Sequence, residues 1–191
     1  TYAYDAENRL IRTVDAESNT TIYTYDALGH MTATVSAMGS ETVSTYDEVG
    51  RLLSATDALG HVTGYEYDAL GRAAKISYAD GSSVSYTYNA NGQVLTAANE
   101  LGNVISYAYD ANGQLISMTD AMGGITVYAY DPVGNVISVT DALGGVVSYL
   151  YDEVGNISTI TDANGNTTSY AYDALGRAVA ITDPNGGITR A

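Results

Sequence analysis

Short segments rich in Val, Ile, Thr and Tyr alternate along the chain with tetrads that begin with Asp and end with Gly. One repeat holds a six-residue segment such as 135–140 and a seven-residue segment such as 145–151, and neither contains proline. This composition and length are typical of β-strands. Glycine recurs about every ten residues, and no stretch keeps a 3.6-residue apolar stripe, so helices are disfavoured. The pattern predicts strands joined by tight turns.

The tetrads are predicted to be type I turns. Two occur in each period, for example Asp57-Ala58-Leu59-Gly60 and Asp68-Ala69-Leu70-Gly71. A type I turn favours Asp first, Pro second and Gly fourth, where a left-handed residue starts a G1 bulge. Both prolines, Pro132 and Pro184, occupy the second position. In the tetrads that begin with the Asp of a Tyr-Asp dipeptide, the assigned turn residues are Asp26, Gly29, Asp68, Gly71, Asp110, Gly113, Asp131, Gly134, Asp152, Gly155, Asp173 and Gly176.

The dipeptide Tyr-Asp returns every 21 residues without insertion or deletion, with Asn89 in place of one Asp. A fixed period of this size indicates an array whose units bury apolar surface only against their neighbours. Residues 1–191 therefore read as one array of nine repeats. Because the chain starts and stops at the same phase of the period, we expect it to be a fragment of a longer chain.

The two tyrosines of each Tyr-x-Tyr are two residues apart and so share one face of their strand. Equivalent strands of successive repeats lie two ladder steps apart, about 9.6 Å, which exceeds the reach of direct aromatic pairing. Aliphatic side chains of the intervening strand, in the columns of Leu53 and Ile76, are expected to fill the gaps. The resulting tyrosine ladder comprises Tyr25, Tyr46, Tyr67, Tyr88, Tyr109, Tyr130, Tyr151 and Tyr172.

The opposite face is not cleanly polar, since it carries Val62, Val104, Ile125 and Val146 among Ser, Thr and Ala. A sheet of about eighteen strands would also exceed the roughly ten strands at which open twisted sheets curl or split. We therefore predict an all-β fold: tandem 21-residue β-hairpin repeats in one continuous antiparallel sheet that curves or spirals into a hollow shell, tube or superhelix.

Composition narrows the classes of function. The formal net charge is -15, and seven Lys plus Arg cannot supply the basic stripe that nucleic acid needs. No apolar run is long enough for a membrane-spanning helix. The absence of cysteine removes disulfides and thiolate chemistry. Since nearly every Asp falls in a turn column, we interpret the acidity as a by-product of turn construction.

Few residues suggest chemistry. His30 and His61 follow turn glycines in different columns and are expected to be solvated turn residues, because no Gly-x-Ser-x-Gly motif accompanies them. The Asp columns would offer oxygen ligands to calcium, but known calcium-loop spacings are absent, and each Asp is needed in its turn. An outward-facing tyrosine ladder would stack sugars; internal packing is the preferred reading. Arg51, Arg72 and Arg177 are expected to extend over neighbouring strands.

The motif Tyr-Asp-Ala-Leu-Gly-Arg at 67–72 and 172–177, followed by Thr-Asp-Ala-x-Gly and Thr-x-Tyr-x-Tyr-Asp, resembles the YD repeat of the RHS family over essentially the whole chain. The resemblance implies a spiralling sheet that forms a hollow shell, as in bacterial polymorphic toxins, insecticidal toxin complexes, wall-associated proteins and teneurins. The segment Asp131-Pro132-Val133-Gly134 is followed by Asn135 and is interpreted as a plain turn, not as the family's Asp-Pro-x-Gly-Leu self-cleavage motif. The unbroken period favours a uniform tube or superhelix over a closed capsule.

These observations predict a non-enzymatic structural scaffold, the wall of a secreted or cell-surface bacterial shell, tube or filament, with no catalytic, cofactor or metal residues. Two alternatives stay open: an adhesin or glycan-binding stalk, and the cage of a polymorphic toxin whose catalytic domain lies outside this segment. The expected partners are neighbouring repeats or other copies of the chain in end-to-end or filament association, an enclosed polypeptide, or a surface glycan.

Overall fold

A computed structural model describes residues 1–190 of the chain, and within this range every regular element is a β-strand. The strands are β1 (Tyr2–Tyr4), β2 (Leu10–Val14), β3 (Thr20–Tyr25), β4 (Met31–Val35), β5 (Glu41–Tyr46), β6 (Leu52–Thr56), β7 (Val62–Tyr67), β8 (Ala73–Ser77), β9 (Ser83–Tyr88), β10 (Val94–Ala98), β11 (Val104–Tyr109), β12 (Leu115–Thr119), β13 (Ile125–Tyr130), β14 (Val136–Thr140), β15 (Val146–Tyr151), β16 (Ile157–Thr161), β17 (Thr167–Tyr172), β18 (Ala178–Thr182) and β19 (Ile188–Arg190). No helix that could span a membrane occurs among the described residues.

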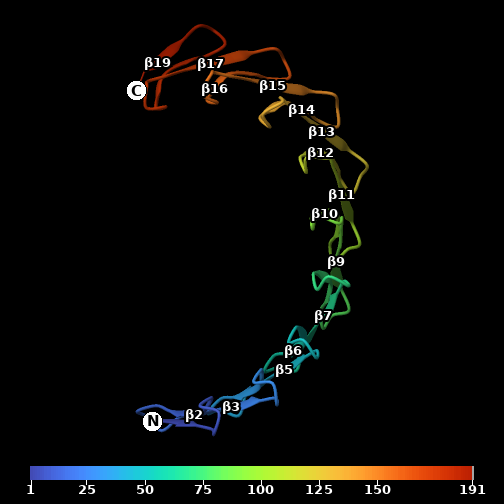
Figure 1. The fold of residues 1–191 in the computed structure, drawn as a ribbon, viewed down its shortest axis with the longest axis vertical. Coiled ribbons are helices and arrows are strands. Elements are labelled where there is room, and N and C mark those ends of the chain that lie inside the picture. Colours follow the sequence, from blue (N-terminus) through green and yellow to red (C-terminus); the bar gives the residue numbers. More distant parts are fainter. Residues whose placement is uncertain (191) are drawn as a thin grey trace. The chain divides into compact units, whose positions relative to one another are not determined.

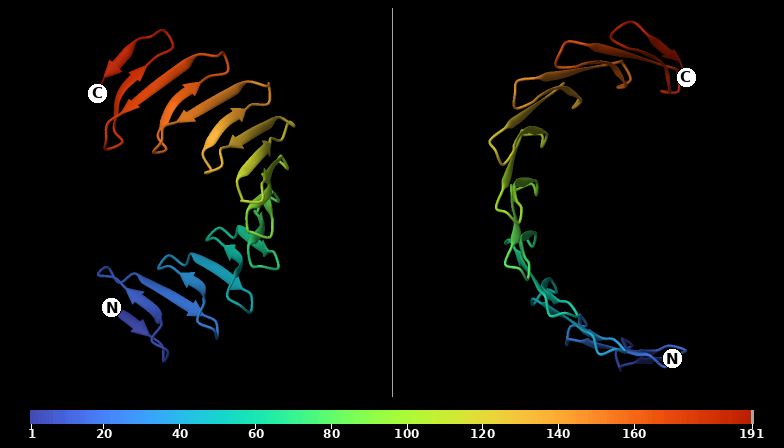
Figure 2. Two further views of the ribbon diagram at one scale, coloured as in Figure 1. Left: turned by 45° about the horizontal axis from the view of Figure 1, so that its top comes forward. Right: turned by 180° about the vertical axis from the view of Figure 1, so that it is seen from behind.

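The fold is all-β and antiparallel, and the 19 strands are assigned to one sheet. Strands that follow each other in sequence pair with each other, as β2 does with β1 and β3, and β14 with β13 and β15. The chain divides into two compact units, residues 1–87 with 97–103 and residues 88–96 with 104–191, and each is described by itself. Within each unit the hairpins follow one another in sequence order (Figures 1 and 2).

Two kinds of turn alternate along the chain, and each kind lies at one edge of the strands. Turn A begins at the residue after Tyr-x-Tyr, and turn B begins after the next, shorter strand. In both kinds the fourth N–H bonds the carbonyl of the first residue. The first residues of turn A are Asp5, Asp26, Asp47, Asp68, Asn89, Asp110, Asp131, Asp152 and Asp173; those of turn B are Asp15, Ser36, Asp57, Tyr78, Asn99, Asp120, Asp141, Asp162 and Asp183.

Each strand is one residue shorter than the sequence segment predicted for it. The residue after the turn glycine, for example Asn135 or Gly145, precedes the strand. Its carbonyl accepts the N–H of the first turn residue, and its own N–H bonds an Asp side chain. This residue therefore closes the turn and does not start the strand.

The hairpins around turn A contain an extra residue that the sequence pattern did not reveal. Between β13 and β14, Ala129 lies opposite Ser138, but Tyr130 lies opposite Val136, so Ile137 is left in a β-bulge. The same shift occurs in the other described turn A hairpins. The hairpins around turn B are regular.

The bulge decides which aliphatic residues face the tyrosines. Ile76 lies opposite Tyr65, in agreement with the prediction that the aliphatic residues in its column pack beside the tyrosines. Leu53 does not lie opposite a tyrosine, because it sits in the bulge and is 42% exposed; Leu52 lies opposite Tyr46 instead. Ile116 and Ile137 occupy the same bulge position as Leu53.

The sheet has no second layer within either unit, and no residue from 1 to 190 is fully buried. Most domains bury an apolar face between two layers of secondary structure. Here, cross-strand side-chain pairs and turn hydrogen bonds must supply most of the stabilisation.

Candidate functional site

The repeating polar unit of this protein is a turn pentad, made of the four turn residues and the residue that follows them. In the pentad at 131–135, Asp131 Oδ1 accepts the N–H groups of Val133 at 3.0 Å and Asn135 at 2.9 Å. The Gly134 N–H bonds the Asp131 carbonyl at 3.1 Å. One carboxylate oxygen thus satisfies two backbone donors that the tight turn leaves without carbonyl partners.

The fourth turn residue has a left-handed backbone. Gly134 has φ of +100°, a region in which a side chain causes strain. In the first repeat the same positions hold Asn8 and Ser18, at φ of 62° and 68°, and no other non-glycine residue among those described has positive φ. Asp131-Pro132-Val133-Gly134 has the same hydrogen bonds as the other pentads that begin with Asp, so the structure places it in an ordinary turn.

In most turn A pentads the side chain of the fifth residue donates a hydrogen bond to the second carboxylate oxygen. Arg51 Nε donates to Asp47 Oδ2 at 2.6 Å, and Asn135 Nδ2 donates to Asp131 Oδ2 at 2.9 Å. The expectation that Arg51 simply extends over a neighbouring strand therefore missed an ion pair with its own turn. The signal was present in the sequence, because the fifth residue of every turn A pentad carries a side-chain N–H: Arg9, His30, Arg51, Arg72, Gln93, Gln114, Asn135, Asn156 and Arg177.

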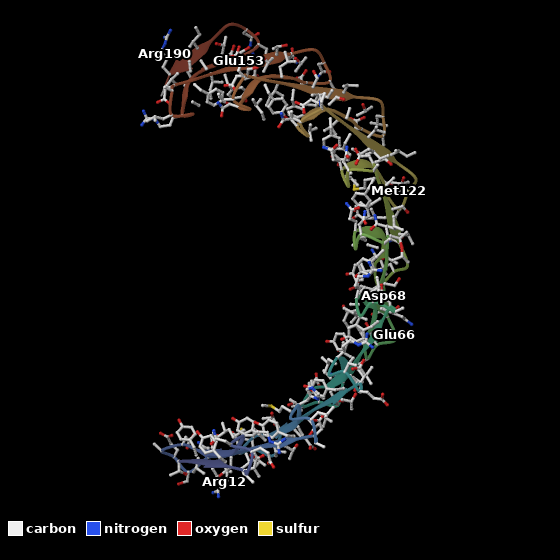
Figure 3. All side chains as sticks on the ribbon, viewed as in Figure 1. Arg12, Glu66, Asp68, Met122, Glu153 and Arg190 are labelled. Carbon is white, nitrogen blue, oxygen red and sulfur yellow. The ribbon has the colours of Figure 1, made fainter. Side chains whose placement is uncertain are left out.

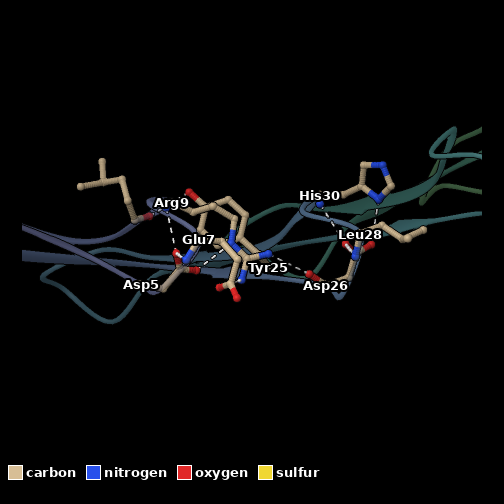
Figure 4. A network of polar contacts seen from close by, with 8 residues as sticks. Asp5, Glu7, Arg9, Tyr25, Asp26, Leu28 and His30 are labelled. Carbon is tan, nitrogen blue, oxygen red and sulfur yellow. Dashed lines mark hydrogen bonds and ion pairs between the residues drawn. The ribbon is translucent and has the colours of Figure 1, made fainter.

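The same fifth residue reaches the next repeat. The Arg51 guanidinium carbon lies 4.9 Å from the centre of the Tyr67 ring, within cation–π range. Arg9 Nη1 donates to the Asp26 carbonyl at 3.1 Å and covers the Tyr25 ring, as Figure 4 shows. Arg9 and Arg51 thus each link their own turn to the tyrosine of the following repeat.

His30 was expected to be a solvated turn residue, but its side chain is only 29% exposed. Its Nδ1 atom lies 2.9 Å from Asp26 Oδ2, and its ring stacks on Tyr46 with centroids 4.9 Å apart. His61, in a turn B pentad, makes the corresponding contact with Asp57 but keeps 61% of its side chain exposed. The two histidines thus have structural positions equivalent to those of Arg51 and Asn166.

The second tyrosine of Tyr-x-Tyr bonds the preceding repeat through its hydroxyl. Tyr151 Oη donates to the Val136 carbonyl at 2.7 Å, and Tyr130 Oη donates to the Leu115 carbonyl at 2.8 Å. The same bond joins Tyr25 to Leu10, Tyr46 to Met31, Tyr67 to Leu52, Tyr109 to Val94 and Tyr172 to Ile157. Partial burial raises the pKa of Tyr130, which keeps this donor protonated.

These hydroxyl bonds compensate for a gap in the ladder. Between β14 and β15 only three residue pairs are in register, at the turn B end, and Val136 has no partner in β15. The tyrosine hydroxyl supplies a donor to the carbonyl that this divergence leaves open. The Tyr-Asp dipeptide therefore combines a donor to the previous repeat with the acceptor of its own turn.

The turn network lowers the pKa of several aspartates. For Asp152 the largest cause is the side-chain hydrogen bond from Asn156, partial burial opposes it, and the N–H groups of Asn156 and Val154 lower the pKa further. For Asp173 the largest cause is the side-chain hydrogen bond from Arg177. These carboxylates are held ionised as turn acceptors. Within residues 1–190, no group of three or more His, Asp or Glu is arranged to hold a metal ion.

The sequence matches the family described as Teneurin YD-shell over residues 1–131 and the RHS Repeat family over residues 130–159 and 151–188. This protein belongs to the Teneurin YD-shell family, since that match covers more than half of the chain. The resemblance inferred from the repeats is confirmed. A search of curated proteins found no match.

Solved structures of Tc toxin proteins share the fold. The TcdB2-TccC3-Cdc42 crystal structure aligns with a TM-score of 0.60 at 17% identity and covers 96% of this chain and 13% of its own. A Tc holotoxin pore from Photorhabdus luminescens aligns with a TM-score of 0.61 at 18% identity, with coverages of 100% and 15%. The family match makes this protein a shell-repeat array. The chain covers only a small part of the length of these solved structures.

Proposed function

We propose that this chain is a wall segment of a secreted or cell-surface bacterial shell, tube or filament, and that it acts as a scaffold without chemistry of its own. The observation that carries this proposal is that the polar groups of the repeat are occupied within the array. The turn carboxylates bond their own pentads, and the Tyr-Asp hydroxyls bond the preceding repeat. A continuous wall is built from repeats whose polar groups form hydrogen bonds within the repeat or with the neighbouring repeat.

The partner we propose is a polypeptide that the shell encloses, contributed by the longer protein to which the array belongs. Two facts support it. The YD-shell family match names a shell, and the similar solved structures are Tc toxin proteins. The single-layer sheet also leaves both faces without a covering layer in each unit, so a scaffold that encloses would present one of them to its contents.

Site-directed labelling of the two faces tests the proposal in the intact protein. Thr42 and Thr45 are both exposed on β5 and point to opposite faces, Thr42 to the tyrosine face. Because residues 1–191 contain no cysteine, Thr42→Cys and Thr45→Cys each add one labelling site to this segment, and mass spectrometry of the peptide that contains β5 detects the label. A wall predicts that a bulky maleimide modifies only one of the two in the native protein, and both after unfolding. A stalk, as in an adhesin, would react equally at both positions and would refute the wall.

A further inference from the structure

Leu150 marks the point at which one repeat departs from the others. It lies between Tyr149 and Tyr151 in β15, points to the opposite face from them, and is 63% exposed. The equivalent residues of the other repeats are Ala3, Thr24, Thr45, Glu66, Thr87, Ala108, Ala129 and Ala171. None of these is a large apolar residue, so the sheet does not need one at this position. A single exposed Leu requires no explanation, but Leu150 belongs to a larger apolar group.

This apolar group lines an open cleft of about 530 Å³ between the turn A pentads at 131–135 and 152–156. The cleft lies wholly within the second compact unit. Its apolar lining includes Val133, Ile137, Leu150 and Val154. The volume falls within the range of about 300–1,000 Å³ that is usual for ligand pockets. One repeat therefore presents a concave apolar surface at its turn A end.

The cleft lies where two neighbouring strands diverge. β14 and β15 pair only through residues 138–140, at the turn B end, so Val136 and Ile137 have no partner in β15. Leu150 lies beyond Ser148, the last residue of β15 that pairs with β14. An extended peptide brings both backbone hydrogen-bonding groups and side chains to a gap at the end of a strand ladder. The position of the cleft therefore favours an extended polypeptide as its occupant.

The cleft is acidic as well as apolar. Asp131, Asp152 and Glu153 line it, and Glu153, which is labelled in Figure 3, is exposed. The fifth residue of both flanking pentads is Asn, which donates a hydrogen bond but brings no positive charge. Residues 104–176 of this unit contain eight acidic residues and neither Lys nor Arg. The three carboxylates are not arranged to hold one metal ion, so separate cationic groups of a ligand complement them best.

We propose that this cleft binds an extended segment of a partner polypeptide in which a Leu or Ile side chain is flanked by Lys or Arg. The apolar side chain packs against Leu150 and Ile137, and the flanking cations pair with the carboxylates at the rim. The site belongs to one repeat of the second unit. The proposal therefore goes beyond the wall function and holds whether or not the wall encloses a polypeptide.

Binding of one short segment is expected to be weak, because a single apolar anchor and exposed ion pairs supply it. A dissociation constant of about 0.1–1 mM at low salt is the expected range. Salt screens exposed charges, so the affinity should fall several-fold between about 20 mM and about 300 mM NaCl. The apolar contact should remain at the higher salt concentration.

Titration of a peptide into the ¹⁵N-labelled 191-residue chain, followed by two-dimensional NMR, tests the proposal. The probe is acetyl-Gly-Lys-Leu-Lys-Gly-amide. Acetyl-Gly-Lys-Ser-Lys-Gly-amide keeps the charges without the anchor, and acetyl-Gly-Gln-Leu-Gln-Gly-amide keeps the anchor without the charges. The probe should shift the amides of residues 131–137 and 149–156, and each control peptide should bind at least about fivefold more weakly. The pentad at 110–114 is the internal reference, because Ala108 stands there in place of Leu150.

A first variant removes the apolar lining. It carries Leu150→Ala and Ile137→Ser, and other repeats already hold Ala129 and Ser158 at these positions, so the fold should be kept. Its affinity for the probe should fall at least about fivefold. Ile116→Ser is the matched control, since Ile116 occupies the same bulge position outside the cleft, and it should leave binding unchanged. Far-UV circular dichroism verifies that each variant is folded.

A second variant removes the charges and carries Asp131→Asn, Asp152→Asn and Glu153→Ala. Asn89 shows that an amide oxygen serves the turn, so this variant should also stay folded. It should bind the probe no better than the wild type binds the uncharged control peptide.

Three results would overturn the proposal. The first is a folded variant of either kind that binds the probe as strongly as the wild type. The second is a probe that shifts all the turn A pentads equally, since that would show a general attraction to negative charge. The third is the absence of localised shifts up to about 10 mM probe, which is weaker than specific binding.

Discussion

The turn aspartate is the residue on which most of the local structure converges. In the pentad at 110–114, Asp110 Oδ1 accepts the N–H groups of Asn112 at 2.9 Å and Gln114 at 2.8 Å. Asn89 performs the same function with its amide oxygen, bonding Asn91 at 2.9 Å and Gln93 at 3.0 Å. In turn A this position is therefore filled by a short side chain with an acceptor oxygen, and the acceptor does not need a charge.

Two substitutions of Asp110 separate the role of its acceptor oxygen from that of its charge. Asp110→Ala removes the acceptor from two N–H groups and should lower the free energy of unfolding by about 1–3 kcal/mol. Asp110→Asn keeps the acceptor, as Asn89 does, and should cost less than half as much. Urea unfolding of the two variants measures the difference. Equal losses would mean that the charge, and not the turn bond, stabilises the pentad.

Tyrosine hydroxyls distinguish the two tyrosines of each strand. Tyr151→Phe removes the donor to the Val136 carbonyl and should lower the free energy of unfolding by about 1 kcal/mol. Tyr149, on the same strand and face, makes no hydroxyl hydrogen bond to a described residue, so Tyr149→Phe is the matched control and should be near neutral. Thermal melting of both variants decides the point, and a larger loss for Tyr149→Phe would contradict the role assigned to the hydroxyl.

At the scale of the hairpin, the bulge keeps all the paired tyrosines on one face of the sheet although the repeat has an odd number of residues. Side chains alternate faces with a period of two, and cross-strand partners share a face. Val127 lies opposite Thr140, which lies opposite Val146, so Val127 shares a face with a residue 19 positions later. Its equivalent one repeat on is Ser148, two positions further and on the same face. If β13 and β14 paired without a bulge, Val127 would align across β14 with Val147, which is 20 positions later. Ser148 would then lie on the opposite face from Val127, and the tyrosines would change face in every repeat.

Single-residue deletions test this explanation. Deleting Ile137 removes the bulge but leaves all the other pairs of β13, β14 and β15 intact, so the array should stay folded with only a modest loss of stability. Deleting Ser148 instead leaves the two ends of β15 on conflicting faces, because Ser148 pairs with both Ser138 and Thr161. Circular dichroism and urea unfolding should show a much larger loss for the Ser148 deletion. Equal losses would show that the bulge does not set the register.

At the scale of the whole molecule, the same register staggers the repeats. Equivalent residues move two positions along the strand direction per repeat, which is one residue per strand. A stagger of one residue per strand is that of an eight-stranded barrel of shear number 8, whose strands tilt by about 36°. The strands of each unit are therefore expected to lie oblique to the direction in which the sheet grows.

The turn network also predicts acid lability of the whole array. The pKa values of Asp5, Asp15, Asp26, Asp47, Asp57, Asp68, Asp80, Asp131, Asp152, Asp162 and Asp173 are all lowered in the fold. A carboxyl with a folded pKa below its unfolded value of about 3.9 contributes stability above that value and loses it as pH falls through the folded pKa.

The melting temperature should therefore change little from neutral pH to about pH 4.5 and fall steeply below about pH 4. The melting temperature should be measured in high salt, because acid also relieves the repulsion among the negative charges and thereby raises stability. Salt screens this repulsion, so that the loss of the turn bonds can be measured by itself. A melting temperature that rises below pH 4 in high salt would show that charge repulsion outweighs the turn bonds.

The sequence by itself determined the repeat, the turns and the strands, because each depends on local chemistry. Asp-x-x-Gly encodes a type I turn and a left-handed residue, and the Val, Ile, Thr and Tyr segments between turns encode strands. The shell-repeat family was also readable, since its motif is contained within one period. The donor side chain at the fifth position of turn A was visible as a column, although its partner was not recognised.

Only the tertiary structure decided how the repeats engage each other. The bulge at Ile137 depends on registers that two different turns impose on one strand, and no local pattern records that conflict. The bond from Tyr151 to the Val136 carbonyl and the stacking of His30 on Tyr46 join residues about 15 positions apart across strands. Such contacts follow from stagger and strand divergence, which are properties of paired strands and not of any single segment.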